Sequence, residues 1–374
     1  MVIGVPVRCG QVSDWQPVMQ VAINCLSQRS SVCRAPEPER RSTSVRSSCY
    51  IRNVMDQPAQ HGDTDRFAVI DVGSNSVKFS IAVAGERRPS IIETGRIVAQ
   101  LGSGMTDEGK LNDESMQRTA DAVAELASEA RAQEVQVIRA VATSAAREAS
   151  NSGKLKKMVK ESSGLELEII SGDREAELIF KAVSGHHLVH EQGSIVFDTG
   201  GGSTEIVIAD QKKISGCWST PLGALRLAHQ FQATGRVKRR QVEDIRSHVS
   251  LVIQEQGIEA GETDLIIGTG GTCTALALMD IGPLPIVRKS KPPSILRENH
   301  TISRDKVEEL LTMVRRMELE ERKTKVGLQA RRAEIIVAGI CIVAELMQVF
   351  QKDWLTLMDV GLRDGLLREM MPQD

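Results

Sequence analysis

The sequence predicts an α/β protein made of two halves of similar design that face each other across a cleft. Three observations lead to this prediction. Apolar runs typical of buried strands alternate with segments of helical periodicity from residue 67 onward. A hairpin pattern, two apolar runs joined by a glycine-containing turn, occurs at 67–84 and again at 193–211. Each copy opens its own α/β half, and two halves of one design are expected to flank a cleft.

Composition narrows the class of protein. The chain has 374 residues, 41% hydrophobic and 26% charged, which is enough for two domains with separate cores. Its net charge of -2 provides no global field that would attract nucleic acid or a membrane surface. The best candidate for a membrane span, near 335–350, is interrupted by Glu345. We therefore expect neither nucleic acid nor a membrane as a partner.

Residues 1–66 differ from the rest of the chain. They are rich in Arg and Ser and show no strand or helix periodicity. We expect a disordered tail or an extension upstream of true initiation near Met55, with a transit peptide as the alternative. The seven cysteines of the whole chain form no CxxC pair, which argues against a zinc site or a disulfide framework and favours the cytoplasm.

Periodicity defines the elements of the first half. After the hairpin FAVIDVGSNSVKFSIAVA, a glycine-containing loop precedes a helix that begins around Asp113, with apolar residues at helical spacing. The further expected elements are strands at 90–99, 135–145 and 165–172 and helices at 152–162 and 173–186. We assign residues 67–185 to a first domain, which the C-terminal helix at 360–374 joins.

The second half starts again with a hairpin, GSIVFDTGGGSTEIVIADQ. The strand LIIG follows and runs through the glycine cluster 268–274 into a helix, which is an anion-binding arrangement. From Ser303 the pattern is largely helical, and it closes with the strand WLTLM and a turn into the last helix. We assign residues 186–359 to a second domain.

The glycine turns contain more glycines, hydroxyls and carboxylates than their geometry requires. A hairpin needs only a short turn with one or two glycines. Asp71 and Asp198 lie 127 positions apart, and each is followed by a glycine two residues later and a serine three residues after that. Backbone N–H groups held by glycine, with serine and threonine hydroxyls as extra donors, are well suited to hold a phosphate chain. The turns therefore predict a phosphate-binding site.

A phosphate site flanked by carboxylates needs a cation. Asp71 and Asp198 would repel phosphate unless Mg²⁺ lay between them, bound by one or two carboxylates with water and phosphate oxygens. Aspartates also favour turns without any metal, but their paired recurrence argues for the metal role. Glu205, at the end of GGGSTE, is a second carboxylate available for chemistry, or else a surface residue at a strand end.

Seven motifs in order carry a family resemblance: DVGSNSVKFSIA, ISGDREAELIF, VFDTGGGSTEIVI, GCWSTPLGALRL, IIGTGGTCTALA, RRAEIIVAGICIV and MDVGLRDGLL. Together they closely resemble the exopolyphosphatase and guanosine pentaphosphate phosphatase (Ppx/GppA) family, in the superfamily of acetate kinase, sugar kinases, heat-shock chaperone ATPases and actin. The resemblance covers residues 67–374. It implies two ribonuclease H-like (actin-like ATPase) domains flanking an active-site cleft, and Mg²⁺-dependent release of terminal phosphate.

The resemblance also implies roles for individual residues. Glu175 of SGDREA matches the glutamate that polarises the attacking water, Glu205 assists it, and Asp71 and Asp198 match the metal-associated aspartates. The implied phosphate-binding residues are Gly73, Ser74, Asn75, Ser76, Arg147, Gly200, Gly201, Gly202, Ser203, Gly270, Gly271 and Thr272.

Plainer interpretations of two of these residues stay open. Taken alone, Glu175 is more typical of an exposed first-turn glutamate, and Arg147 could be a solvated helix residue. The chain departs from the family pattern at Lys78, where an arginine is frequent, and so loses bidentate geometry.

The predicted function is exopolyphosphatase activity, the removal of terminal orthophosphate from inorganic polyphosphate by a cytoplasmic homodimer. Hydrolysis of guanosine pentaphosphate is the first alternative, and the low aromatic content of 3% weighs against it because a guanine pocket benefits from a stacking ring. A phosphotransferase, a chaperone-like ATPase and a non-catalytic nucleotide or phosphate sensor are the further alternatives.

Overall fold

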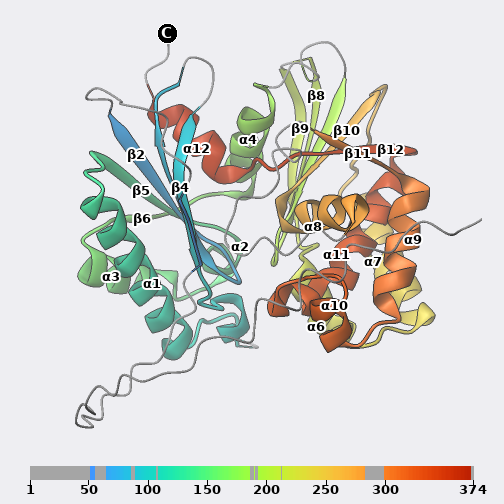
Figure 1. The fold of residues 1–374 in the computed structure, drawn as a ribbon, viewed down its shortest axis with the longest axis horizontal. Coiled ribbons are helices and arrows are strands. Elements are labelled where there is room, and N and C mark those ends of the chain that lie inside the picture. The colour runs from blue at the N-terminus through green and yellow to red at the C-terminus, as the bar shows by residue number, and fades with distance from the viewer. Residues whose placement is uncertain are drawn as a thin grey trace, which may run out of the picture. The chain divides into compact units, whose positions relative to one another are not determined.

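The computed structural model describes residues 51–54, 65–85, 89–106, 108–185, 189, 193–211, 213–282 and 299–371. Contacts divide the chain into Met1–Ser47, no residue of which is described, and a compact unit Ser48–Asp374. The described part of this unit contains two six-stranded mixed sheets with helices packed on their faces (Figure 1). The predicted α/β class is therefore confirmed.

The first sheet has the strand order β1-β4-β3-β2-β5-β6. Its strands are β1 (Ile51–Val54), β2 (Arg66–Val72), β3 (Val77–Val83), β4 (Ser90–Ile97), β5 (Val137–Ala142) and β6 (Leu167–Ile169). Strands β2, β3 and β4 form an antiparallel meander, whereas β5 lies parallel to β2 and β6 lies parallel to β5. The expected hairpin at 67–84 is thus β2 and β3.

Strand β1 differs from the expectation that the fold begins at residue 67. It lies inside the segment 1–66 and pairs antiparallel with β4 at the edge of the sheet. A four-residue edge strand such as IRNV is held by backbone hydrogen bonds along one side, and it is too short to produce a periodic hydrophobic pattern.

The second sheet has the order β11-β12-β10-β7-β8-β9. Its strands are β7 (Ser194–Thr199), β8 (Thr204–Asp210), β9 (Lys213–Thr220), β10 (Leu265–Thr269), β11 (His300–Ser303) and β12 (Trp354–Leu357). Strands β7, β8 and β9 form the meander, and β10 and β12 continue the sheet in parallel. The order β9-β8-β7-β10-β12 therefore repeats the order β4-β3-β2-β5-β6 of the first sheet.

The repeat extends to a local irregularity of the backbone. In the first sheet the pairing of β3 with β4 shifts register between Ile81 and Ala82. In the second sheet the pairing of β8 with β9 shifts between Ile208 and Ala209. The two register shifts are separated from each other by 127 positions, the same offset that separates Asp71 from Asp198. The two halves are thus one design in backbone geometry as well as in sequence pattern.

Helices cover the outer face of each sheet. On the first sheet, α1 (Asp113–Ala132) and α3 (Ser152–Ser163) close one core, beside the short η1 (Gly102–Gly104) and α2 (Ser144–Glu148). Helix α1 begins at Asp113 because Asn112 accepts a hydrogen bond from the backbone N–H of Ser115. On the second sheet a larger set of helices closes another core: α6 (Ala224–Gln230), α7 (Arg239–Glu255), α8 (Gly270–Ile281), α9 (Arg304–Arg315), α10 (Leu319–Thr324) and α11 (Ala330–Val349).

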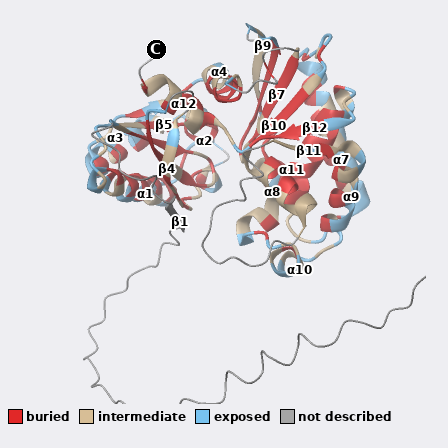
Figure 2. Cartoon of the chain, turned by 45° about the horizontal axis from the view of Figure 1, so that its top comes forward, coloured by how far each residue is buried: buried red, intermediate tan, exposed pale blue. Residues whose placement is uncertain are grey.

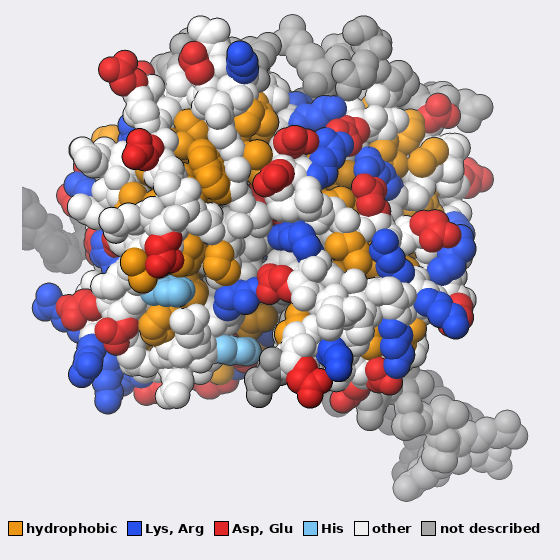
Figure 3. All heavy atoms as spheres, turned by 180° about the vertical axis from the view of Figure 1, so that it is seen from behind, with side chains coloured by type: hydrophobic (Ala, Val, Ile, Leu, Met, Phe, Trp, Pro, Cys, Tyr) orange, Lys and Arg blue, Asp and Glu red, His pale blue; other side chains and the backbone are white. Residues whose placement is uncertain are grey.

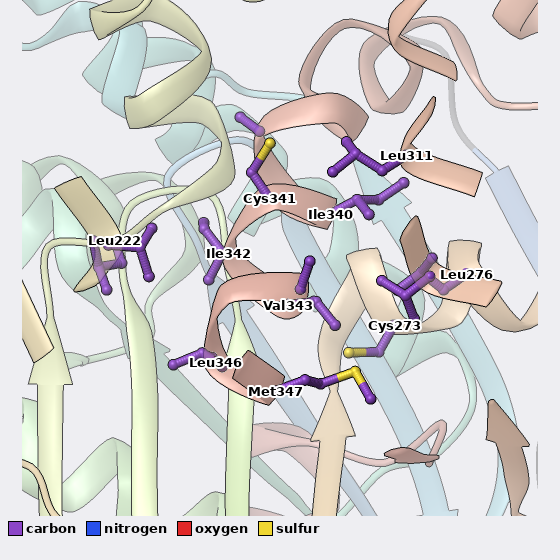
Figure 4. Close-up of a cluster of buried hydrophobic side chains, with 14 of the residues drawn as sticks. Leu222, Cys273, Leu276, Leu311, Ile340, Cys341, Ile342, Val343, Leu346 and Met347 are labelled. Carbon is purple, nitrogen blue, oxygen red and sulfur yellow. The ribbon is translucent and has the colours of Figure 1, made fainter. Parts of the chain in front are cut away.

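Helix α11 contains the apolar stretch near 335–350. Its side chains are buried on almost all sides, and Figure 4 shows six of them with four from neighbouring elements: Leu222, Cys273, Leu276, Leu311, Ile340, Cys341, Ile342, Val343, Leu346 and Met347. The carboxylate of Glu345 is also buried, where it accepts hydrogen bonds from Arg246 and Ser250 of α7. Among the described residues no helix is both long and apolar enough to span a membrane.

Two helices lie between the sheets and create a third core. Helix α4 (Gly172–Val183) packs on β8 and β9, whereas α12 (Leu362–Met370) packs on β2 and β3. The two helices also pack on each other, closely enough that a Cβ on Gly365 would lie 2.7 Å from the carbonyl carbon of Leu178. This core takes buried residues from both sheets, and Figure 2 colours the buried segments of the chain red. On the face shown in Figure 3, acidic and basic side chains are interspersed.

Candidate active site

A cavity of about 370 Å³ lies where parallel strands of both sheets end. Residues at or just beyond the carboxyl ends of β2, β5, β7, β10 and β12 line it. Side chains at this edge of parallel strands point away from the packed sheet, which is why ligands of open α/β folds bind there. The lining includes nearly all the predicted site residues: Asp71, Gly73, Ser74, Asn75, Ser76, Glu175, Asp198, Gly200, Gly201, Gly202, Ser203, Glu205, Gly270 and Gly271.

The two hairpin turns have the same internal geometry and face each other. The N–H of Gly73 donates to the carbonyl of Ser76 at 3.2 Å, and the N–H of Gly200 donates to the carbonyl of Ser203 at 3.0 Å. A Cβ on Gly202 would overlap the Oγ of Ser144 and lie 2.6 Å from that of Ser74. Glycine at 202 therefore allows the turn of the second half to touch hydroxyl groups of the first half.

The third glycine turn approaches two charged groups. Gly270 has a φ of +86°, and a Cβ there would lie 2.6 Å from Oδ1 of Asp198. A Cβ on Gly271 would lie 2.7 Å from the guanidinium carbon of Arg332. Thr272 behaves differently: its side chain packs towards Gly339 of α11, and it does not line the cavity.

The two predicted catalytic glutamates are both buried. Glu175 is 7% exposed and Glu205 is 2% exposed, so neither is the solvated residue of the plainer interpretations. Glu175 lies in the first turn of α4, whose start is fixed by Ser171, which accepts from the backbone N–H of Arg174. Burial and then the negative charge of Glu205 raise the pKa of Glu175 well above its usual range, against the opposing effect of Arg147.

A different set of neighbours shifts the pKa of Glu205. It lies opposite Asp198 in the register of β7 and β8. Burial raises the pKa of Glu205 to about 7, and the charge of Asp198 adds to the increase. Hydrogen bonds from Ser203 and Ser219 oppose it, the latter at 2.9 Å to Oε1. A carboxylate with this pKa exchanges protons near neutral pH.

Arg147 lies behind Glu175 and does not line the cavity. Its Nη1 donates to Oε2 of Glu175 at 2.9 Å and to the carbonyl of Ile170 at 3.1 Å. Its Nη2 donates to Oγ of Ser219 at 3.2 Å. The structure thus brings Arg147 to a predicted catalytic residue, whereas the sequence analysis expected it at the phosphate.

The two predicted metal residues, Asp71 and Asp198, line the cavity from equivalent positions of the two halves. Lys78 lies 4.0 Å from Asp71, and Thr269 donates to Asp198 at 2.9 Å. Burial raises the pKa of Asp198, opposed by the Thr269 hydrogen bond and by Lys78. Within the described ranges, no cluster of three or more His, Cys, Asp or Glu forms a metal site. Two carboxylates fit Mg²⁺, which keeps several waters and takes phosphate oxygens as further ligands.

Cationic side chains complete the lining: Lys78, Arg96, Arg332 and Arg363. Arg363 donates to the carbonyl of Phe79 and to Oγ of Ser80, which directs it from α12 towards the first sheet. Burial lowers the pKa of Arg332 to about 10, so it is charged at neutral pH. No local sequence signal singled out Arg96, Arg332 or Arg363. The last two lie inside the motifs RRAEIIVAGICIV and MDVGLRDGLL, which was the available signal.

Comparison with known proteins agrees with this geometry. A family model described as the Ppx/GppA phosphatase family matches residues 66–374. Exopolyphosphatase 1 of Mycobacterium tuberculosis is 27% identical over 306 residues, which cover 81% of this chain and 87% of that protein. A guanosine-5'-triphosphate,3'-diphosphate pyrophosphatase of Vibrio parahaemolyticus is 27% identical over 327 residues, which cover 84% of this chain and 61% of that protein. The crystal structure of the Aquifex aeolicus member of the Ppx/GppA protein family matches with a TM-score of 0.69 and 29% identity, covering 82% of this chain and 97% of that one.

Proposed function

Because the chain belongs to the Ppx/GppA phosphatase family, we propose that it is a Mg²⁺-dependent exopolyphosphatase. It would hydrolyse the terminal phosphoanhydride bond of inorganic polyphosphate and release orthophosphate. The observation that carries this proposal is the pair of facing glycine and hydroxyl turns with two buried glutamates beside them. A structural hairpin requires none of these features.

The turns supply binding and orientation. Phosphoryl transfer passes through a loose transition state, so catalysis depends on positioning and on stabilising charge more than on covalent help. The hydroxyls of Ser74, Ser76 and Ser203 line the cavity beside the glycine backbone and can donate to phosphate oxygens. Lys78, Arg96, Arg332 and Arg363 provide the positive charge that a polyanion requires.

The glutamates supply proton transfer. In the proposed step the oxygen of a water molecule attacks the terminal phosphorus while the bridging P–O bond breaks and the shortened chain leaves with the bond electrons. The proton of the water passes to Glu175, whose raised pKa makes its carboxylate a stronger base. Glu205 orients the water. A positioned carboxylate base contributes about 10²–10⁴-fold to the rate.

Asp71 and Asp198 would hold the magnesium ion. When bound, it neutralises phosphate charge beside these carboxylates and leaves room for water and phosphate oxygens in its coordination shell. A second pocket-facing aspartate pair, Asp359 and Asp364, lies at the start of α12. Burial raises the pKa of Asp364, and the charge of Arg363 opposes this increase. We assign no metal role to that pair.

Polyphosphate is preferred over guanosine pentaphosphate because the part of the cavity that the structure describes has no Phe, Tyr, Trp or His in its lining. A guanine base would therefore have no aromatic side chain to stack on there. Guanosine pentaphosphate hydrolysis is the second candidate, since one relative carries that name, and a non-catalytic sensor is the third. The cytoplasmic location stays a prediction. The homodimer stays a prediction.

The test is phosphate release by the purified chain, with Mg²⁺, from long-chain polyphosphate and guanosine pentaphosphate in parallel. Glu175→Gln should lower kcat on polyphosphate by about 10²–10⁴-fold. Glu177→Gln is the matched control, because its side chain lies on the same helix and is 49% exposed. No release from either substrate by a folded protein would overturn the hydrolase proposal in favour of a sensor.

A further inference from the structure

The two catalytic glutamates lie on different elements and need a means of keeping their mutual position. Glu175 belongs to α4, which packs between the sheets, and Glu205 belongs to strand β8 of the second sheet. A side chain that misses its productive position by about 1 Å costs about 10²-fold in rate. Whatever fixes the two carboxylates relative to each other therefore contributes to the proposed reaction.

One hydroxyl group joins the surroundings of the two glutamates. Arg147 donates through Nη1 to Glu175 and through Nη2 to Oγ of Ser219, at 2.9 and 3.2 Å. The same Oγ donates to Oε1 of Glu205 at 2.9 Å. The result is a continuous chain, Glu175–Arg147–Ser219–Glu205, in which Ser219 both accepts and donates. The hydroxyl thereby uses its single O–H donor and one of its two acceptor lone pairs.

The fold provides a dedicated place for this hydroxyl. Ser219 lies near the end of β9, and the first residue of α4 is Gly172. A Cβ on Gly172 would overlap the Cβ of Ser219 and lie 2.9 Å from its Oγ. Glycine is an unfavourable choice inside a helix but is tolerated at its first turn, so its presence here is explained by the contact with Ser219.

Ser219 does not line the cavity, and so it would not touch the substrate. We propose that Ser219 is a positioning residue that fixes Glu175, through Arg147, and Glu205 directly, in the relative geometry that hydrolysis requires. The inference rests on the proposed function. It adds that Glu175 and Glu205 are aligned through one side chain of β9, that of Ser219, which packs against Gly172.

The experiment compares wild type, Ser219→Ala and Ser219→Thr in steady-state hydrolysis of polyphosphate with Mg²⁺. Loss of a hydrogen bond to a charged group predicts a kcat about 10- to 100-fold lower in Ser219→Ala, with KM within about twofold of wild type. Ser219→Thr keeps the hydroxyl and should recover most of the loss. The matched control is Ser215→Ala on the same strand, whose hydroxyl donates only to the carbonyl of Ile208.

A second variant keeps the test informative if Ser219→Ala does not fold. Gly172→Ala leaves every hydrogen-bonding group in place but pushes Ser219 aside, and it should lower kcat to a similar extent while the far-UV circular dichroism is unchanged. A Ser219→Ala enzyme as active as Ser215→Ala, a change confined to KM, or a fully active Gly172→Ala would overturn the inference alone. An inactive wild type would instead overturn the proposed function on which it rests.

Discussion

Replacing Glu205 with Gln should make the protein more stable at alkaline pH while it removes activity. The folded-state pKa of about 7 lies above the ordinary value of 4.5, so folding favours the protonated carboxyl. The contribution of this group to stability is therefore full below about pH 4.5 and is lost as the pH rises through about 7. At about 1.4 kcal/mol for each pKa unit, the ionised glutamate costs about 3 kcal/mol at pH 8, and glutamine avoids this cost.

The free energy of unfolding is measured by urea denaturation at about pH 5 and pH 8, with a chelator present so that metal binding does not contribute. The gain of Glu205→Gln over wild type should be about 2–3 kcal/mol larger at the higher pH. Glu108→Gln, at a side chain that is 75% exposed, should show the same pH dependence as wild type. An equal gain at both pH values would refute the reasoning, because glutamine would then act through packing and not through charge.

Four further predictions follow from the same structure. Gly202→Ala adds a methyl group against the hydroxyls of Ser74 and Ser144 and should lower kcat/KM for polyphosphate by about 100-fold, measured by phosphate release. Arg226→Ala removes the ion pair with Glu148, at 2.6 Å, that joins α6 to α2, and it should raise KM several-fold. The unfolding free energy should change by no more than about 1 kcal/mol, because both side chains are partly exposed. Arg322→Met deprives four backbone carbonyls of a fully buried donor and should destabilise the protein by about 3–5 kcal/mol in urea unfolding. Finally, kcat/KM should rise with pH as Glu205, whose pKa is about 7, and the proposed base Glu175, whose pKa is also raised, ionise; a flat profile between about pH 5.5 and 8.5 would contradict the assigned roles.

The elements that the sequence predicted well are those whose signal is local. The hairpins at 67–84 and 193–211 combine apolar runs with a glycine turn, and both exist in the structure. The start of α1 at Asp113 was predictable from the apolar residues at helical spacing that follow it, and the structure shows that Asn112 caps it. The duplication was visible because aspartate, glycine and serine recur at a fixed offset of 127 positions. The register shifts of the two meanders are separated by the same offset.

The parts that escaped prediction depend on contacts between distant segments. Arg332 reaches the cavity from α11 and Arg363 from α12, and no local pattern indicates which arginine of a helix faces a site formed by other strands. Thr272 lies in the third glycine cluster like its neighbours, but the first turn of α8 directs it towards Gly339. The family resemblance implies that Arg147 lies near the phosphate, and no local pattern indicates that its guanidinium would bind Glu175.

The duplicated hairpins also explain how one design came to hold two different chemistries. Lys78 and Glu205 are equivalent, since they are 127 positions apart and pair with Asp71 and Asp198 in the same register. In the first half the position carries the ammonium group of Lys78, whose positive charge suits phosphate binding. Burial lowers the pKa of this group, and the charge of Asp71 opposes the decrease. In the second half it carries a carboxylate, whose pKa is raised to about 7 by burial and, to a smaller extent, by the charge of the neighbouring Asp198. Two copies with identical charges would give either a site without the water-orienting carboxylate or a site that repels its substrate, so the divergence at this one pair of positions is what the proposed hydrolysis requires.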